Sequence, residues 1–108
     1  EEIERDFLEY KILQLLEGKE GEVLEGIVVS VIESGIFIFL PEYFITGFMP
    51  FASIKEIYFI PDKTKQRAKA AGKNFHIKIR DGVLVKIVEV NPFKRTLRLH
   101  LIKKIAEK

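Results

Sequence analysis

The feature that most constrains the fold is a series of five short stretches rich in β-branched, aliphatic and aromatic residues, with glycine at or between them. These stretches cover residues 23–32, 36–40, 46–50, 83–90 and 95–101. Such composition favours β-strands. Alternation is clearest in the last stretch, where leucines at 97, 99 and 101 separate Thr96, Arg98 and His100. Gly26 interrupts the first stretch, which predicts a bend or bulge at that point.

Two further segments accompany these predicted strands. Residues 3–16 predict a helix that ends at Gly18 and Gly21, because their apolar residues recur at helical spacing: Ile3, Phe7, Leu8, Ile12, Leu15 and Leu16. Residues 55–82 form a long insertion in which "EIYFI" and "FHIKI" could pair as a hairpin, and "FASI" before it predicts a short helical turn. Five strands with an element between the third and fourth are typical of the OB fold. We therefore predict an all-β chain, a five-stranded antiparallel OB-fold barrel with an N-terminal helix and a long insert.

Charge is distributed unevenly along the 108 residues. Residues 1–20 and 21–60 each carry a net charge of −4, whereas residues 61–108 carry fourteen basic and four acidic residues, a net charge of +10. A basic segment beside aromatic strands indicates a polyanionic partner. The alternative is that these lysines and arginines simply face water, as charged runs commonly do. The chain has no cysteine, which excludes disulfides and thiolate metal sites, and no apolar run is long enough to predict a membrane span.

Aromatic residues are concentrated between residues 34 and 54. In the second predicted strand, side-chain alternation places Ile36, Ile38 and Leu40 on one face and Phe37 and Phe39 on the other. Since one face of a barrel strand is core, the second apolar face must be either covered or exposed. The insertion or the N-terminal helix could cover it, or the phenylalanines could form a stacking surface for nucleobases.

Catalytic and metal-binding motifs are missing from the sequence. His76 and His100 lack cysteine or carboxylate partners at ligand spacing, so we expect no zinc site and no cofactor. "AAGKN" lacks the upstream glycine and the following Ser or Thr of a phosphate-binding loop. No carboxylate cluster matches a two-metal nuclease. We therefore expect that the chain by itself is not an enzyme.

The sequence resembles the S1 RNA-binding domain, an OB-fold module. The resemblance rests on "GEVLEGIVVSVIESGIFIFL", "TGFMPFASI" and "GVLVKIVEVNPFKRTLRLHL", with glycines at 21, 26, 35 and 47 at the family's spacing. The preceding helix and the long insertion are similar to the C-terminal S1 domain of ribonuclease R and ribonuclease II exonucleases. This resemblance implies a linker helix at 1–19, an S1-like domain at 20–102 and a basic tail at 103–108. It also implies a larger parent protein whose catalytic domain is a partner.

The resemblance assigns RNA-binding positions one at a time. The family's aromatic on the second strand is Phe37, and the basic residue at the start of the fifth strand is Arg95. The aromatic before the turn glycine is replaced by Ser34, a histidine after the third strand by Pro50, and an aspartate after the fourth strand by Asn91. Phe39 could replace the missing aromatic. The predicted RNA-binding residues are Phe37, Phe39, Phe48, Lys86, Asn91, Arg95 and Arg98.

These observations lead to one main functional hypothesis and two alternatives. We expect a cytoplasmic, monomeric module that binds single-stranded RNA by stacking and phosphate contacts and clamps the substrate of a 3′-to-5′ exoribonuclease. The first alternative is a barrel used for protein interaction or regulation with a weakened RNA site, which the residues at Ser34, Pro50 and Asn91 favour. The second is a binder of single-stranded DNA, which differs in its use of the 2′-hydroxyl.

Overall fold

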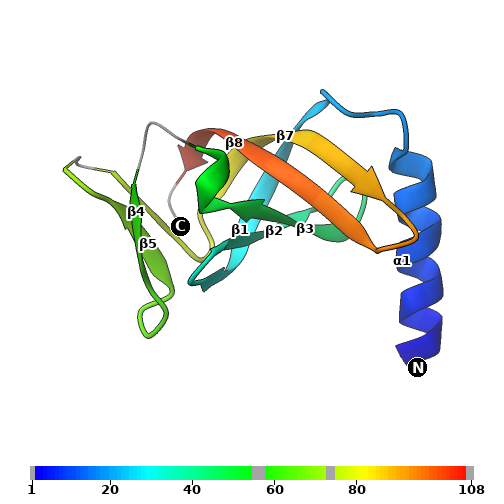
Figure 1. The fold of residues 1–108 in the computed structure, drawn as a ribbon, viewed down its shortest axis with the longest axis horizontal. Helices are drawn as coiled ribbons and strands as arrows, with labels where there is room; N and C mark the ends of the chain where they lie inside the picture. The colour runs from blue at the N-terminus through cyan, green and yellow to red at the C-terminus, as the bar shows by residue number, and fades with distance from the viewer. Residues whose placement is uncertain (1, 55–57, 73–74, 107–108) are drawn as a thin grey trace.

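The computed structural model describes residues 2–54, 58–72 and 75–106. The chain begins with helix α1 (Glu2–Leu16), which ends just before Gly18 and Gly21, both with positive φ. The predicted helix is therefore present, and its Leu13 is buried. Of its predicted apolar face, Leu16 is buried and Ile12 packs against the core, whereas Leu8 and Leu15 are exposed. The helix packs on the end of the barrel with its last turns, so only the residues that reach the strands are covered (Figure 1).

The five predicted strands form a closed barrel. They are β1 (Val23–Ile32), β2 (Gly35–Leu40), β3 (Ile45–Pro50), β7 (Gly82–Asn91) and β8 (Thr96–Ala106), hydrogen-bonded in the order β1-β2-β3-β8-β7. The predicted OB-fold barrel is thus confirmed, with one departure from the antiparallel arrangement: β3 and β8 run parallel where they meet. Closure around an odd number of strands requires such a parallel pair, because alternating directions cannot match at the seam.

Two details of the barrel strands differ from the sequence-based expectation. The register shift in β1 lies between Val28 and Ser30, not at Gly26. Gly26 is needed for space instead, because a Cβ there would collide with the side chain of Ile38 inside the barrel. The last strand continues past Leu101 to Ala106, and Lys103 and Lys104 pair with β7.

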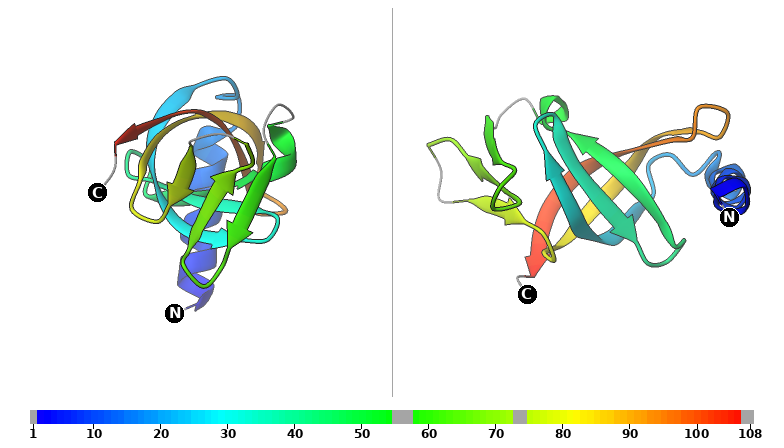
Figure 2. Two further views of the ribbon diagram at one scale, coloured as in Figure 1. Left: turned by 90° about the vertical axis from the view of Figure 1, so that its left-hand side faces the viewer. Right: turned by 90° about the horizontal axis from the view of Figure 1, so that it is seen from below.

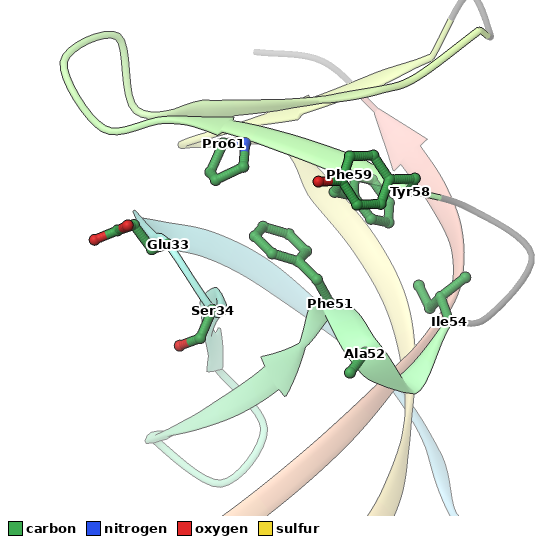
Figure 3. Close-up of a pocket in the computed structure, with 8 residues that line it drawn as sticks. All are labelled: Glu33, Ser34, Phe51, Ala52, Ile54, Tyr58, Phe59 and Pro61. Carbon is green, nitrogen blue, oxygen red and sulfur yellow. The ribbon is translucent and has the colours of Figure 1, made fainter.

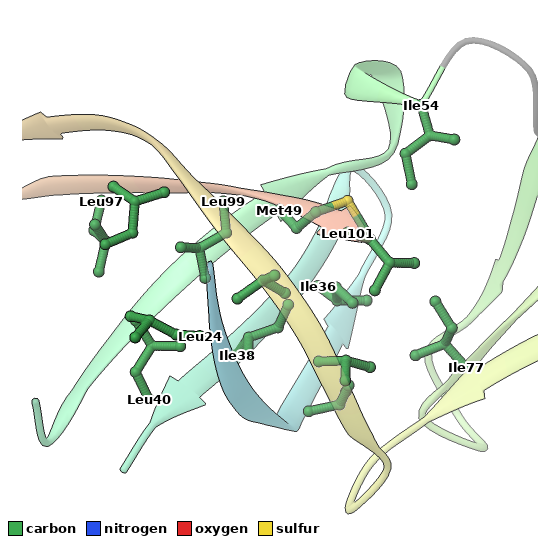
Figure 4. Packing of buried hydrophobic residues seen from close by; sticks show 14 of the residues in the cluster. Leu24, Ile36, Ile38, Leu40, Met49, Ile54, Ile77, Leu97, Leu99 and Leu101 are labelled. Atoms are coloured by element: carbon green, nitrogen blue, oxygen red, sulfur yellow. The ribbon is translucent and has the colours of Figure 1, made fainter. Parts of the chain in front are cut away.

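The barrel interior is filled by the inward-facing residues of all five strands. Figure 4 shows this packing, in which Ile36, Ile38 and Leu40 of β2 meet Leu97 and Leu99 of β8. These side chains are almost completely buried. The predicted inward face of β2 is therefore correct, and Phe37 and Phe39 lie on the outer face.

The insertion forms a separate small sheet. After a 3-10 turn, η1 (Phe51–Ser53), the chain makes β4 (Phe59–Asp62), β5 (Arg67–Ala70) and β6 (His76–Lys78), paired antiparallel in the order β4-β5-β6. The expected helical turn is present. The expected hairpin is wrong, because its two strands each pair with β5 and not with each other, and residues 56 and 57 lie outside the described residues. Figures 1 and 2 show this sheet and α1 at opposite ends of the barrel.

A buried carboxylate joins the insert to the barrel. Asp81 is completely buried, and its Oδ2 lies 3.2 Å from the Lys104 Nζ of β8. The same oxygen accepts a hydrogen bond of 2.9 Å from the backbone N–H of Lys78 in β6. Lys104 also donates to the carbonyl of His76 at 3.1 Å. A buried charge is tolerated only when it is paired and hydrogen-bonded, so this arrangement fixes β6 against β8.

A second contact fixes the other side of the insert. The side-chain amide of Gln66 bridges both backbone groups of Val31 in β1: its Oε1 accepts from the Val31 N–H at 2.9 Å, and its Nε2 donates to the Val31 carbonyl at 3.1 Å. Gln66 has a positive φ of 52°, a conformation that L-residues adopt at a cost. Together with Asp81, this contact gives the insert a defined position on the barrel.

Asp81→Ala should destabilise the chain by about 3 kcal/mol, because it removes one partner of a buried ion pair and the acceptor of the Lys78 N–H. Chemical denaturation measures this change. The control is Glu33→Ala, which removes an exposed carboxylate 3.2 Å from Lys63 and should cost less than about 1 kcal/mol. Equal stability of the two variants would show that Asp81 does not hold the insert.

Candidate nucleic-acid interface

A row of outward-facing side chains crosses four strands of the barrel. Strand pairing sets Phe37 of β2 opposite Phe48 of β3, Phe48 opposite Arg98 of β8, and Arg98 opposite Glu89 of β7. We call these four residues the central row. The aromatic rings of Phe37 and Phe48 lie with centroids 5.0 Å apart at 48°. Both rings are half-buried, so each is held by packing while part of it remains open to solvent.

The charged end of the central row is an exposed ion pair. Arg98 Nε lies 3.5 Å from Glu89 Oε1, and about half of each side chain is exposed, 54% for Arg98 and 52% for Glu89. Exposed pairs of this kind contribute little to stability because water competes for both partners. The guanidinium of Arg98 can therefore exchange the carboxylate for another anion beside Phe48. Sequence reasoning identified Arg98 but missed Glu89, although its place among outward-facing residues of an amphipathic strand was a usable signal.

Phe39 lies one outward position further along β2, toward the end of the barrel that carries α1. It pairs with Thr46 of β3 and packs edge-on against Phe44, with ring centroids 5.2 Å apart at 83°. Phe44 has a positive φ of 54° and is 77% exposed. Phe39 therefore shares a face with Phe37 but belongs to a second aromatic pair.

Tyr43 belongs to neither aromatic pair. Its hydroxyl donates a 2.9 Å hydrogen bond to Glu22 Oε1, and this bond, together with burial and the nearby negative charges, raises the pKa of Tyr43 above its ordinary value. The ring also packs against the hydrophobic core. Tyr43 therefore has a structural role.

The remaining predicted site residues are separated from the central row. Lys86 is exposed on β7 and pairs with His100, so it lies on the same outer face one step along the β7–β8 ladder. Asn91 accepts a 3.1 Å hydrogen bond from the backbone N–H of Lys94, which commits its side chain to the turn between β7 and β8. Arg95 lies in that turn with a φ of 53°.

Arg95 belongs to the α1 end of the barrel. It lines a small cavity of about 60 Å³ with Glu9 and Leu13 of α1 and with Thr46, the strand partner of Phe39. The predicted set thus divides into Phe37, Phe48 and Arg98 in the central row, Lys86 beside it, and Phe39, Asn91 and Arg95 toward α1. The sequence-based hypothesis grouped Arg95 with Phe37 and Phe39, whereas strand register places Arg98 opposite Phe48, the ring partner of Phe37.

Comparison with known proteins gives a consistent result. The family described as the S1 RNA binding domain matches residues 17–101. Ribonuclease R of Buchnera aphidicola subspecies Schizaphis graminum is 27% identical over 101 residues, covering 94% of this chain and 14% of the relative. Ribonuclease R of Escherichia coli K12 is 26% identical over 102 residues, covering 94% of this chain and 12% of the relative.

Solved structures give the same result. RNase R of Mycoplasma genitalium, in complex with ribose-methylated single-stranded RNA, aligns with a TM-score of 0.83 at 27% identity, covering 92% of this chain and 15% of that one. An uncharacterized protein of Methanocaldococcus jannaschii aligns with a TM-score of 0.51 at 22% identity, covering 77% of this chain and 90% of that one, and shows the fold alone. The resemblance to S1 domains and to ribonuclease R is confirmed. The chain spans only 12–15% of the length of these ribonuclease R proteins.

Two negative findings concern the described part of the chain. Within residues 2–54, 58–72 and 75–106, no group of three or more histidine, cysteine, aspartate or glutamate side chains could hold a metal ion. Over the same residues, no helix has both the length and the hydropathy needed to cross a bilayer.

Proposed function

We propose that this chain, which belongs to the family of S1 RNA-binding domains, binds single-stranded RNA across the central row on the outer face of its barrel. The observation that supports this most is the placement of two half-buried aromatic rings directly beside an exposed arginine by strand pairing. Flat rings stack on nucleobases and an arginine holds phosphates, which are the two contacts that a single-strand binder requires.

The central row fits RNA binding without strong sequence preference. Stacking tolerates every base, because each presents a π-face, and phosphate contacts carry no sequence information. Lys86 extends the basic side of the row by one ladder step. Phe39 and Arg95 would meet RNA only where a strand continues toward α1, and Asn91 would act by shaping the β7–β8 turn.

The role within a larger protein is a further part of the proposal. The relatives are ribonuclease R proteins, and the chain matches a small fraction of each. We infer that residues 20–102 clamp single-stranded RNA beside the catalytic domain of a 3′-to-5′ exoribonuclease, with residues 1–19 as a linker helix and 103–108 as a basic end. The chain itself would be a non-catalytic, monomeric module acting in the cytoplasm.

A second candidate is a barrel that binds protein instead of RNA. Its specific support is that Arg98 already has a carboxylate partner in Glu89 and that the side chain of Asn91 is committed to a turn. Binding measurements separate these alternatives. An RNA-binding barrel should bind single-stranded RNA, with single-stranded DNA of the same sequence as the comparison, whereas a protein-binding barrel should bind the catalytic domain of the parent protein.

Phe37→Ala should weaken binding of single-stranded RNA by about 1–3 kcal/mol, since it removes one stacking surface. Fluorescence anisotropy with a labelled oligonucleotide measures the affinity. Phe93→Ala is the matched control, because Phe93 is 84% exposed in the β7–β8 turn and lies outside the central row.

The melting temperatures of the Phe37→Ala and Phe93→Ala variants distinguish loss of the binding site from loss of the fold. A Phe37→Ala variant that melts near the parent and binds RNA as the Phe93→Ala variant does would refute the central row. Failure of the parent chain to bind RNA even at low salt would favour the protein-binding barrel.

Glu89→Ala and Arg98→Ala should change RNA affinity in opposite directions. Removing Glu89 relieves Arg98 of a competing anion and should raise the affinity about two- to fivefold. Removing Arg98 should lower the affinity and reduce the slope of log K against log salt by about 0.7, the value for one phosphate contact on a single strand. Lys103→Ala is the basic control on β8 and should change neither the RNA affinity nor the salt slope. A salt slope that is the same for Arg98→Ala and the parent would contradict the phosphate contact.

The purified chain should leave RNA intact in the presence of Mg²⁺ or Mn²⁺, because two-metal nucleases need a carboxylate cluster and the described residues contain none. Gel electrophoresis of labelled RNA after prolonged incubation checks this expectation. Shortening of the RNA that survives repurification and disappears on substitution of a residue of this chain would show that the domain is catalytic.

A further inference from the structure

An open pocket lies between the barrel and the insert, outside the central row. It has a volume of about 780 Å³, and its walls come from the β1–β2 turn, η1 and β4. Figure 3 shows Phe51 pointing from the barrel side toward β4, where Phe59 and Pro61 lie, with Ser34 and Glu33 at the rim.

Three of the residues that line the pocket are aromatic. Phe51 and Phe59 are stacked, with ring centroids 5.0 Å apart at 25°. The ring of Phe75 also contacts Phe59, with centroids 6.4 Å apart at 60°. Tyr58 also lines the pocket and is 76% exposed. A large aromatic side chain exposed next to an apolar pocket is typical of a binding surface, since its burial in the free chain would have been favourable.

The pocket follows the central row along β2 and β3. Directly after the Phe37–Phe48 pair, the next outward pair is Gly35 with Pro50, and the Phe51 N–H then donates to the Ser34 carbonyl at 2.9 Å. A Cβ at Gly35 would lie only 2.7 Å from the ring of Phe48, so this ring rests on the glycine and reaches toward the pocket. Two residues of a strand span about 6.6 Å, roughly two steps of about 3.4 Å along a nucleic-acid strand.

The insert that forms one wall of the pocket is basic, which favours a polyanion. Residues 58–82 contain seven basic and two acidic residues. Glu33, the acidic residue on the rim, is paired with Lys63 at 3.2 Å. On β5, Arg67 and Lys69 face solvent while Ala68 and Ala70 face inward, so the insert presents its positive charge outward.

We propose that this pocket receives a nucleobase of the same RNA strand that crosses Phe37 and Phe48, with Tyr58 as its stacking partner. The inference rests on the proposed function and extends it by a second base subsite formed by the insert. Because Asp81 and Gln66 fix the insert on the barrel, the wall that carries Tyr58 is in place before RNA arrives, which lowers the cost of binding.

Oligonucleotides of different length separate the two sites. A strand of about two nucleotides reaches no further than the Phe37–Phe48 pair, because the next outward pair is already two steps away, and one of about eight reaches the pocket, within the range that single barrels bind. Tyr58→Ala should reduce affinity for the longer strand by about 5- to 150-fold and leave that for the shorter strand unchanged. Tyr58→Phe keeps the ring and should behave as the parent, whereas Phe37→Ala should weaken both lengths.

Tyrosine fluorescence reports base stacking directly, because the chain has three tyrosines and no tryptophan. In a Tyr10→Phe, Tyr43→Phe variant, Tyr58 is the remaining tyrosine, and the longer strand should quench its emission while the shorter one does not. If the longer strand binds the parent but Tyr58→Ala has no effect and no quenching occurs, the pocket proposal is overturned and the proposed function stands. If the parent binds neither strand, both fail.

Discussion

The contact where β3 meets β8 determines both the shape of the barrel and the composition of its outer face. The strands β1, β2 and β3 form one antiparallel unit and β7 and β8 another, and each unit alone would leave unpaired edges. The β1–β7 ladder joins the units on one side, and the short parallel pairing of Phe48 with Arg98 joins them on the other. The same pairing brings β2 and β3, which carry Phe37 and Phe48, next to the β7–β8 hairpin, which carries Arg98. The strand contact that closes the barrel therefore also assembles the candidate RNA surface.

Closure also explains how so many aromatic residues fit in one short segment. The interior is narrow: a Cβ at Gly47 would lie 2.7 Å from the side chain of Leu99, and Gly26 leaves no room for one beside Ile38. Aliphatic residues fill this space, and the aromatic residues take the outer positions. There they divide into the Phe37–Phe48 and Phe39–Phe44 pairs, while Phe51 packs against Phe59 of the insert. The segment thus serves packing and a stacking surface at once.

The insert is stable and has a defined position because of its contacts with the barrel. Three short strands would be marginal by themselves, but one face of this sheet, with Phe59, Ala68 and Ile77, is buried. Asp81 and Gln66 add directional contacts to the barrel. The position of the insert at the start of β2 creates the aromatic pocket next to the central row. A basic, aromatic-lined extension at this place lengthens the surface that the barrel presents.

Much of this arrangement could be predicted from the sequence. Alternation along β2 assigned Ile36, Ile38 and Leu40 to the core and Phe37 and Phe39 to the outside, because successive side chains of a strand point to opposite faces. Glycine spacing and the insert identified the S1 family. Register between strands distant in sequence could not be predicted, because it depends on how closure aligns them. Register alone placed Arg98, not Arg95, beside Phe48, paired Arg98 with Glu89, and gave the insert its third strand. The sequence by itself determined which side chains face outward, since that follows from local periodicity; the tertiary structure decided which of them are neighbours, since that follows from long-range pairing.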